Sequence, residues 1–382
     1  MDWVSSVYFL LIYQQLHLWN SSIHLAPKDS QLARLTYQRF LLALQASGKN
    51  RHFHTFGMLG GFIMENRNYT KEYVSINGIK QFFLHYEIQD AEVVIYLHGG
   101  PGSATSNWAY LTDKDISTHT VVYYDQRGAG KTFLKNKTFN TGATLPTMIE
   151  DLRQTVQYIK DMYKKDKVAL IGHSWGSILG TEFIKQYPQD ILCYIGVGQV
   201  VNSIQGEKVG FDELLKRVDK KNKKHMKKIH DIGDYPFNTI GNYSTKTIKS
   251  VRSLQAKYGM AVDVNKMAKS FMKSPIFNPL DVVAILIGLT VNKKLDESIN
   301  EYDTTTYKKY KIPMYYILGR DDWQVPSIVA AEYFESIDAP KKRLYWIEDA
   351  GHFPGFDKPS EFNRIVYEVL RESREYHASM LD

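Results

Sequence analysis

The sequence predicts an α/β fold with a mostly parallel central sheet, helices on both faces of the sheet and a helical insertion. Two observations carry this prediction. Apolar strand patterns alternate with amphipathic helix patterns from about residue 72 to 202, and again from residue 314 onward. The stretch between them is mainly helical and rich in lysine. An insertion of this kind is expected to form a cap.

The hairpin and the first strands follow from their local patterns. Residues 72–76 and 80–88 flank Asn77-Gly78, a pair that favours a tight β-hairpin. Residues 93–99 and 121–128 are continuous apolar runs that end in glycine-rich turns, which is typical of buried parallel strands.

The later elements continue the alternation. A helix is expected over residues 147–163, with Thr147 as its cap and apolar residues at helical spacing. The remaining predicted elements are a strand at 168–174, a helix at 175–187, a strand at 191–198, a strand at 314–322, a helix at 327–336, a strand at 343–352 and a helix from about 359.

The chain is expected to divide into four segments. Residues 1–63 form an accessory or poorly ordered extension, residues 64–202 and 306–382 form the two parts of the core, and residues 203–305 form the cap. Because the recognisable pattern begins right after it, Met64 is the start that we expect for the natural protein.

Composition excludes several classes of protein. Of the 382 residues, 43% are hydrophobic and 23% are charged, which is normal for a soluble globular protein and unlike a disordered or polytopic membrane protein. The single cysteine, Cys193, excludes an intramolecular disulfide framework and a multi-cysteine zinc site, and its apolar surroundings predict a buried thiol. Neither a membrane-spanning helix nor a secretory signal is evident, so we expect a cytoplasmic protein.

The net charge of +7 is unevenly distributed. Residues 1–63 contribute +3 and residues 208–228 contribute +6, which leaves −2 for the rest of the chain. The lysine-rich segment also carries apolar residues at helical spacing, as a cap helix with a solvated basic face does. No nucleic-acid motif accompanies it, so we expect no nucleic-acid partner.

The strongest chemical signal is Gly-x-Ser-x-Gly at residues 172–176, which follows an apolar strand and opens a helix. This context is that of a nucleophile elbow, in which a serine lies on a sharp turn. Ser174 is therefore the predicted nucleophile. The Trp175 amide at the start of the helix is a predicted donor to an oxyanion.

A nucleophilic serine needs a base and an orienting acid. In proteins with such an elbow, the acid follows the serine in the sequence, and the histidine that acts as the base follows the acid. His352 comes directly after a predicted strand and is the expected base. Asp321 and Asp322 both lie at the end of the preceding predicted strand. The Gly-x-x-Asp spacing and the proline four residues later favour Asp322 over Asp321.

The second oxyanion donor is expected from residues 98–102, with the sequence HGGPG, because this loop follows the first parallel strand. Gly100 is the first choice and Gly99 the second. Asp125 and Arg127 lie in the turn after the next strand, where an ion pair between them is expected to hold loops in place. Three tryptophans could line a pocket at the strand ends or pack in the core: Trp108, Trp175 and Trp323.

Three motifs together, HGGPG at 98–102, DQRGAGKT at 125–132 and GHSWGS at 172–177, resemble the proline iminopeptidase family of α/β-hydrolases. The resemblance covers about residues 70 to 370. It implies an α/β-hydrolase fold with Ser174, Asp322 and His352 as the catalytic triad. It also implies removal of an N-terminal residue, often proline, from a peptide, and no cofactor.

In the family that this sequence resembles, carboxylates of the cap hold the free amino group of the substrate. The acids of the first cap helix are Glu207, Asp212 and Glu213, and a solvated position is expected for them on a lysine-rich helix. The alternative activity is that of a carboxylesterase or amidase with the same triad. Epoxide hydrolases and haloalkane dehalogenases are disfavoured because they carry aspartate at the elbow. The substrate is thus a peptide or a small ester or amide, and the oligomeric state stays open.

Overall fold

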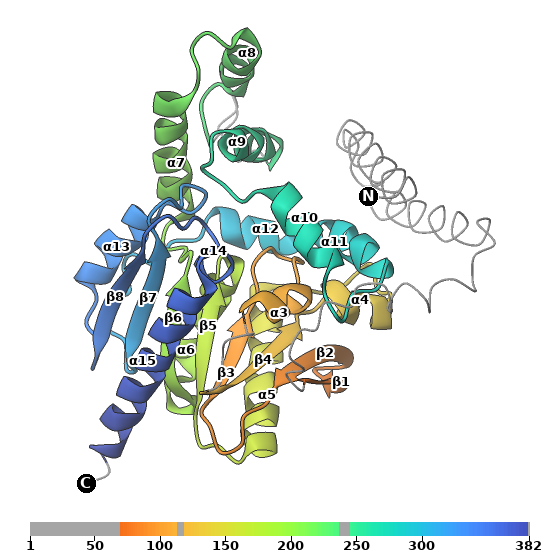
Figure 1. Ribbon diagram of the computed structural model, residues 1–382, viewed down its shortest axis with the longest axis vertical. Helices are drawn as coiled ribbons and strands as arrows, with labels where there is room; N and C mark the ends of the chain where they lie inside the picture. The colour runs from red at the N-terminus through yellow and green to blue at the C-terminus, as the bar shows by residue number, and fades with distance from the viewer. Residues whose placement is uncertain (1–68, 113–117, 237–244, 381–382) are drawn as a thin grey trace, which may run out of the picture. The chain divides into compact units, whose positions relative to one another are not determined.

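The computed structural model describes residues 69–112, 118–236 and 245–380, which belong to one compact unit, Met64–Asp382. The predictions for residues 1–63 fall outside the described residues. Eight described strands form one sheet in the order β1-β2-β4-β3-β5-β6-β7-β8 (Figure 1). The strands are β1 (Tyr69–Ile76), β2 (Ile79–Tyr86), β3 (Val93–Leu97), β4 (Thr120–Asp125), β5 (Val168–His173), β6 (Ile191–Val197), β7 (Met314–Gly319) and β8 (Lys342–Ile347).

The sheet is parallel from β4 through β8 and antiparallel only at its first edge. Strand β2 pairs antiparallel with both β1 and β4, whereas β3 pairs parallel with β4 and β5. The predicted hairpin is confirmed: Ile76 pairs with Ile79, and Asn77 and Gly78 between them have φ angles of 42° and 79°. Two positive φ angles define the hairpin turn that matches the twist of the strands.

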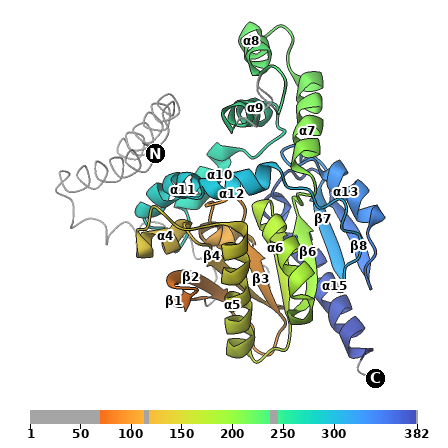
Figure 2. The same ribbon diagram turned by 180° about the vertical axis from the view of Figure 1, so that it is seen from behind.

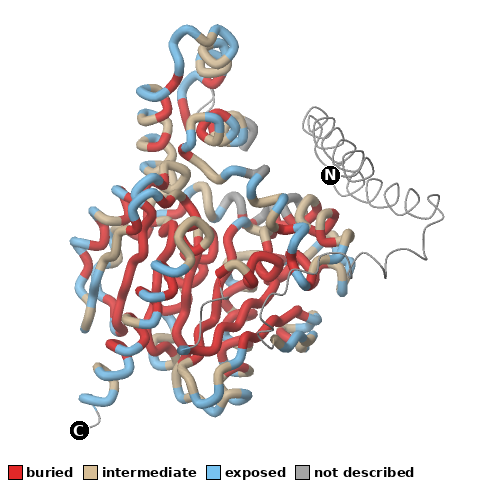
Figure 3. Tube along the Cα trace, in the orientation of Figure 1, coloured by how far each residue is buried: buried red, intermediate tan, exposed pale blue. Residues whose placement is uncertain are grey.

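Helices cover both faces of the sheet, as the sequence predicts. One apolar core includes residues of α5 (Leu145–Tyr163), α6 (Trp175–Gln186) and α13 (Ser327–Ser336). The other includes residues of α15 (Pro359–Ala378), which lies in front of the strands in Figure 1, whereas α5 and α6 lie in front in Figure 2. Every residue of β3 to β7 is buried (Figure 3). Burial on both faces explains why the sequences of these strands are continuous apolar runs.

Two local predictions need correction. Helix α5 is capped by Thr144, whose side chain accepts a hydrogen bond from the Thr147 amide at 3.3 Å, and not by Thr147. The helix therefore starts at Leu145, two residues earlier than predicted. Pro146 fits the first turn of the helix, because an N–H at that position has no helical partner. Strand β8 ends at Ile347, five residues before the predicted end at His352. A short helix that the sequence did not predict, α4 (Gly130–Asn136), follows β4.

Six described helices lie between β6 and β7 and form the cap. Helices α7, α8 and α9 share a small apolar cluster of their own, centred on Leu214, Val251 and Leu254. The cap helices are α7 (Ser203–Arg217), α8 (Lys223–Ile232), α9 (Thr245–Lys257), α10 (Val264–Met272), α11 (Leu280–Val291) and α12 (Lys293–Asn300).

Helix α11 anchors the cap to the core. The Lys131 ammonium of α4 and the Asp281 carboxylate of α11 form an ion pair at 2.5 Å, and both side chains are at least nine-tenths buried. A little further along α11, Gly288 lies against the backbone of the HGGPG loop. A Cβ atom on Gly288 would be 2.6 Å from the carbonyl oxygen of Gly102. The absence of a side chain at Gly288 thus allows α11 to contact this loop.

Replacing Gly288 by alanine is expected to lower the free energy of unfolding by about 1–3 kcal/mol, because the new methyl group meets backbone that cannot move freely. The control is Gly206→Ala in α7, where the nearest atom to the new Cβ is 3.8 Å away. That change is expected to be neutral or to stabilise by up to about 1 kcal/mol, through helix propensity. Urea unfolding measures both. A Gly288→Ala protein as stable as the wild type would contradict the close contact.

Candidate active site

Ser174 lies on the sharp turn between β5 and α6. Its φ and ψ angles are 55° and −123°, a conformation that is strained for any residue other than glycine. Gly176 approaches the carbonyl oxygen of Leu97 so closely that a side chain would overlap it. The sharp turn projects Ser174 beyond the carboxyl end of β5. The Ser174 residue is only partly buried, so a substrate can reach it.

Ser174 is the first member of a hydrogen-bonded chain of three side chains. Its Oγ lies 3.0 Å from Nε2 of His352, and Nδ1 of His352 lies 2.8 Å from Oδ2 of Asp322. A carboxylate only accepts hydrogen bonds, so Nδ1 carries the proton and Nε2 presents its lone pair to the serine hydroxyl. His352 and Asp322 are buried, with 4% and 2% of their surface exposed. These groups are arranged as a nucleophile, a base and an orienting acid.

The loop after β7 distinguishes the two neighbouring aspartates. The Oδ1 atom of Asp322 accepts hydrogen bonds from the amides of Gln324 and Val325, at 3.0 and 2.9 Å, which leaves Oδ2 for His352. Asp321 is exposed, and its amide donates to the carbonyl of Ala350. The structure therefore brings Asp322, and not Asp321, to the histidine.

His173 is a site residue that the motif analysis missed. Its Nε2 atom donates to the carbonyl oxygen of His352 at 2.8 Å, and its ring stacks on Phe353 with centroids 4.7 Å apart. Burial lowers the pKa of His173 to about 3, so the ring is neutral. His173 thereby holds the segment that carries His352. The only signal in the sequence was its position next to the nucleophile.

The HGGPG loop passes beside Ser174. A Cβ atom on Gly99 would be 3.0 Å from the Cβ of Ser174, so Gly99 is in contact with the nucleophile. The next amide along the chain is that of Gly100, and the amide of Trp175 follows Ser174 directly at the N-terminal end of α6. The two amides predicted to bind an oxyanion thus come from segments that meet at Ser174.

Comparison with known proteins agrees with this geometry. Residues 92–229 match the family model described as alpha/beta hydrolase fold. The chain therefore has the α/β-hydrolase fold. Its sequence is 26% identical over 302 residues to a probable aminopeptidase, YbaC, of Bacillus subtilis, covering 77% of this chain and 91% of the relative. It is 25% identical over 308 residues to a proline iminopeptidase of Heyndrickxia coagulans, covering 79% and 99%.

A solved structure shares the fold of this α/β-hydrolase. The crystal structure of a proline iminopeptidase of Mycobacterium smegmatis superposes with a TM-score of 0.58 at 16% identity, covering 80% of this chain and 98% of that chain. At this identity the likeness establishes the fold, and the fold does not determine the substrate. The predicted fold class and the resemblance to proline iminopeptidases are therefore confirmed.

The three tryptophans of the hydrolase have structural contacts. Trp175 is buried in the core, and its indole N–H donates to Oε1 of Gln126 at 2.9 Å. Trp108 donates to the carbonyl of Met267 in cap helix α10 at 3.0 Å. Trp323 is half-buried and lies under the guanidinium of Arg217, 5.1 Å from the ring centroid. Two of the three thus connect the core to the cap.

The acids of cap helix α7 are not all solvated, contrary to the expectation. Glu207 accepts hydrogen bonds from Arg252 and Tyr235 inside the cap. Glu213 accepts from Arg217 at 2.7 Å and from Lys216 at 3.2 Å, and Asp212 is exposed as expected. The charges of Glu207 and Glu213 are therefore already neutralised by cations of this chain.

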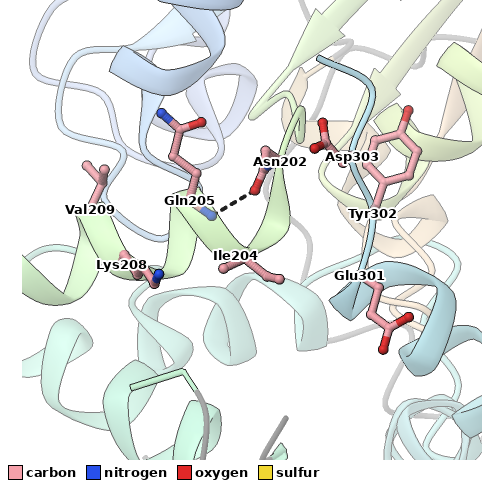
Figure 4. Close-up of a pocket in the computed structure, with 8 residues that line it drawn as sticks. All are labelled: Asn202, Ile204, Gln205, Lys208, Val209, Glu301, Tyr302 and Asp303. Carbon is pink, nitrogen blue, oxygen red and sulfur yellow. Dashed lines mark hydrogen bonds between the residues drawn. The ribbon is translucent and has the colours of Figure 1, made fainter. Parts of the chain in front are cut away.

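A cavity of about 420 Å³ lies where the cap leaves and rejoins the core (Figure 4). Its walls come from the start of α7 and from the segment after α12. Ser174, Asp322 and His352 do not line it. The lining residues are Asn202, Ile204, Gln205, Lys208, Val209, Glu301, Tyr302 and Asp303. Inside the cavity wall, the Asn202 side chain accepts a hydrogen bond from the Gln205 amide at 2.8 Å and so caps α7.

The described residues contain neither a metal-binding cluster nor a membrane-spanning helix. No cluster of three or more His, Cys, Asp or Glu side chains among them could hold a metal ion. None of their helices is long and apolar enough to cross a membrane. Cys193 is fully buried, and burial raises the pKa of its thiol to about 12, which agrees with the predicted structural role.

Arg127 and Asp125 hold loops, as expected, but through partners other than each other. The guanidinium of Arg127 forms two hydrogen bonds of 2.8 Å to the carboxylate of Asp151 in α5, and a third to the carbonyl of Asn77 at 2.9 Å. Asp125 accepts from the amide of Lys131 at 2.7 Å, and burial raises its pKa to about 6. The hairpin, the turn after β4 and α5 are joined in this way.

Replacing Asp151 by asparagine is expected to lower the free energy of unfolding by about 3–5 kcal/mol, because the buried Arg127 then lacks a counter-charge. The control is Glu150→Gln in the same helix. Glu150 pairs with Arg153, and both side chains are more than a third exposed. That change is expected to cost less than about 1 kcal/mol. Chemical denaturation of both variants measures the difference, and equal losses would refute the structural role of the buried pair.

Proposed function

We propose that this protein is a serine hydrolase that removes an N-terminal residue from peptides through an acyl-enzyme. The observation that carries the proposal is the hydrogen-bonded chain from Ser174 through His352 to Asp322. The position of Ser174 on an elbow, next to the HGGPG loop and the start of α6, supports acyl transfer. The names of the similar proteins support the aminopeptidase part.

In the first half of the reaction, Oγ of Ser174 attacks the carbonyl carbon of the scissile bond while its proton passes to Nε2 of His352. The carbonyl oxygen becomes an oxyanion, which the amides of Trp175 and Gly100 stabilise. Asp322 stabilises the protonated imidazole through Nδ1. When the tetrahedral intermediate collapses, the bond to the leaving group breaks and His352 donates its proton to that group.

In the second half, a water molecule takes the place of the leaving group. His352 accepts a proton from the water, and the resulting hydroxide attacks the carbonyl carbon of the ester on Ser174. The same two amides stabilise the second oxyanion. Collapse releases the acyl product as an acid and returns the proton to Oγ of Ser174.

A carboxylesterase or amidase is the alternative, and one observation favours it. Recognition of a free amino group calls for an unpaired carboxylate near the scissile bond, yet Glu207 and Glu213 of the first cap helix are paired with arginine and lysine. An esterase needs no such carboxylate. The proposed substrates are thus peptides first and small esters or amides second. The cytoplasmic location and the absence of a nucleic-acid partner stay predictions of the sequence.

A panel of aminoacyl arylamides and short-chain aryl esters tests the proposal, with Ser174→Ala and Ser253→Ala as variants. Ser253 is exposed on cap helix α9 and serves as the matched control. The loss of the nucleophile is expected to lower kcat/KM by roughly 10³-fold or more. Covalent labelling by a fluorophosphonate, measured by mass spectrometry, should map to Ser174. Equal turnover by wild type and Ser174→Ala would refute the mechanism.

The same panel separates the two activities. An aminopeptidase should hydrolyse a proline arylamide and lose that activity when the substrate's amino group is acetylated, because the free amine is part of what it binds. An esterase or amidase should prefer the aryl ester and tolerate acetylation. Tolerance of acetylation with a preference for esters would replace the aminopeptidase proposal by the alternative.

The neighbouring aspartates give a further prediction. Asp322→Asn is expected to lower kcat by about 10²- to 10⁴-fold, because an amide cannot stabilise the imidazolium and favours the wrong tautomer of His352. Asp321→Asn, one residue away and exposed, should keep kcat within about threefold of the wild type on the same substrate. If only the Asp321 variant lost turnover, the assignment of the acid would be wrong.

A further inference from the structure

Gln126 is a buried residue that the proposed mechanism does not use. It follows β4 directly, and only 1% of its surface is exposed. It lies between two segments that are far apart in the sequence, namely the HGGPG loop after β3 and the start of α6 after β5. These are the segments that carry the Gly100 and Trp175 amides.

Both polar atoms of the Gln126 side chain have a partner in one of these segments. Its Nε2 atom donates to the carbonyl of His98 at 3.1 Å, and its Oε1 atom accepts from the indole N–H of Trp175 at 2.9 Å. A single carboxamide therefore bridges the two segments. Because one end must donate and the other must accept, neither glutamate nor an apolar residue can replace it.

The backbone of Gln126 adds a third link through His98. The Gln126 amide donates to Nε2 of His98 at 3.0 Å, and Nδ1 of His98 then donates to the carbonyl of Gly99 at 2.8 Å. Both ring nitrogens are thus used, in a tautomer that requires a neutral ring. Burial keeps it neutral by lowering the pKa of His98 to about 4. The imidazole connects Gln126 to the residue that contacts Ser174.

We propose that Gln126 is a positioning residue that sets the separation of the two oxyanion donors, the amides of Gly100 and Trp175. The inference rests on the proposed function. Oxyanion donors act only when they lie about 2.7–3.1 Å from the position of the developing charge. A shift of about 1 Å in one segment relative to the other costs up to about 10²-fold in rate. A carboxamide bonded to both segments opposes such a shift.

Two variants that remove different numbers of hydrogen bonds test this role. Gln126→Met removes both side-chain hydrogen bonds at a similar volume. Trp175→Phe removes only the indole donor and keeps the backbone amide of residue 175. The matched control is Gln199→Met, another glutamine with 1% exposure, whose side chain bonds Thr181, Tyr194 and Val200. It should lose stability to a similar degree, and its partner in α6, Thr181, lies six residues beyond Trp175.

The measurements are kcat and KM on the best arylamide or ester, the rate of fluorophosphonate labelling, and the free energy of unfolding. Gln126→Met is expected to lower kcat and the labelling rate by about 10- to 100-fold with KM within about threefold, since the oxyanion exists only in the transition state and the intermediate. Trp175→Phe should have a smaller effect in the same direction. The rate loss of the double variant should be smaller than the product of the two single losses, because both changes break the same hydrogen bond between Gln126 and Trp175.

The proposal is overturned if Gln126→Met keeps wild-type kcat, if KM rises while kcat is unchanged, or if Gln199→Met lowers kcat equally. If Gln126→Met does not fold, Trp175→Phe decides: unchanged kcat and labelling rate would overturn the proposal. Failure of the proposed function is recognised separately, because wild-type turnover would then survive Ser174→Ala.

Discussion

The parallel arrangement of the central strands is the constraint on which the site depends. In a parallel sheet the carboxyl ends of the strands lie at one edge, and ligands bind in α/β proteins outside that edge. His98, Gln126 and Ser174 follow β3, β4 and β5, and Asp322 and His352 follow β7 and β8. Ser174 and His352, which are 178 positions apart, therefore meet within hydrogen-bond distance.

Burial then determines the chemistry at this edge. Desolvation lowers the pKa of His98 to about 4 and that of His173 to about 3, so both rings are weak bases for the proton of the serine. The carboxylate of Asp322 is buried too, but two amides and one imidazole satisfy it. The side chains of His98, Gln126 and Asp322 are thus each bonded through both of their polar atoms, which limits the movement of the loops that carry them.

The cap contacts the same loops from above. Helix α11 lies on the HGGPG loop through Gly288 and on α4 through the Lys131–Asp281 pair. Gln255 of α9 donates to the carbonyl of Trp323, next to Asp322. The cap and the loops of the candidate site are therefore in direct contact at two places, one at the HGGPG loop and one beside Asp322.

The sequence by itself determined the fold class, the elbow serine and the histidine, because these depend on local patterns: apolar runs, glycine spacing and the order of the motifs. The spacing to Gly319 and Pro326 also favoured Asp322 over Asp321, and the structure has Asp322 beside the histidine. It could not find the roles of Gln126 and His173, the partner of Arg127 or the ion pairs of Glu207. Each of these contacts joins segments that only the tertiary structure brings together, and a hydrogen bond between distant segments leaves no periodic pattern in either of them.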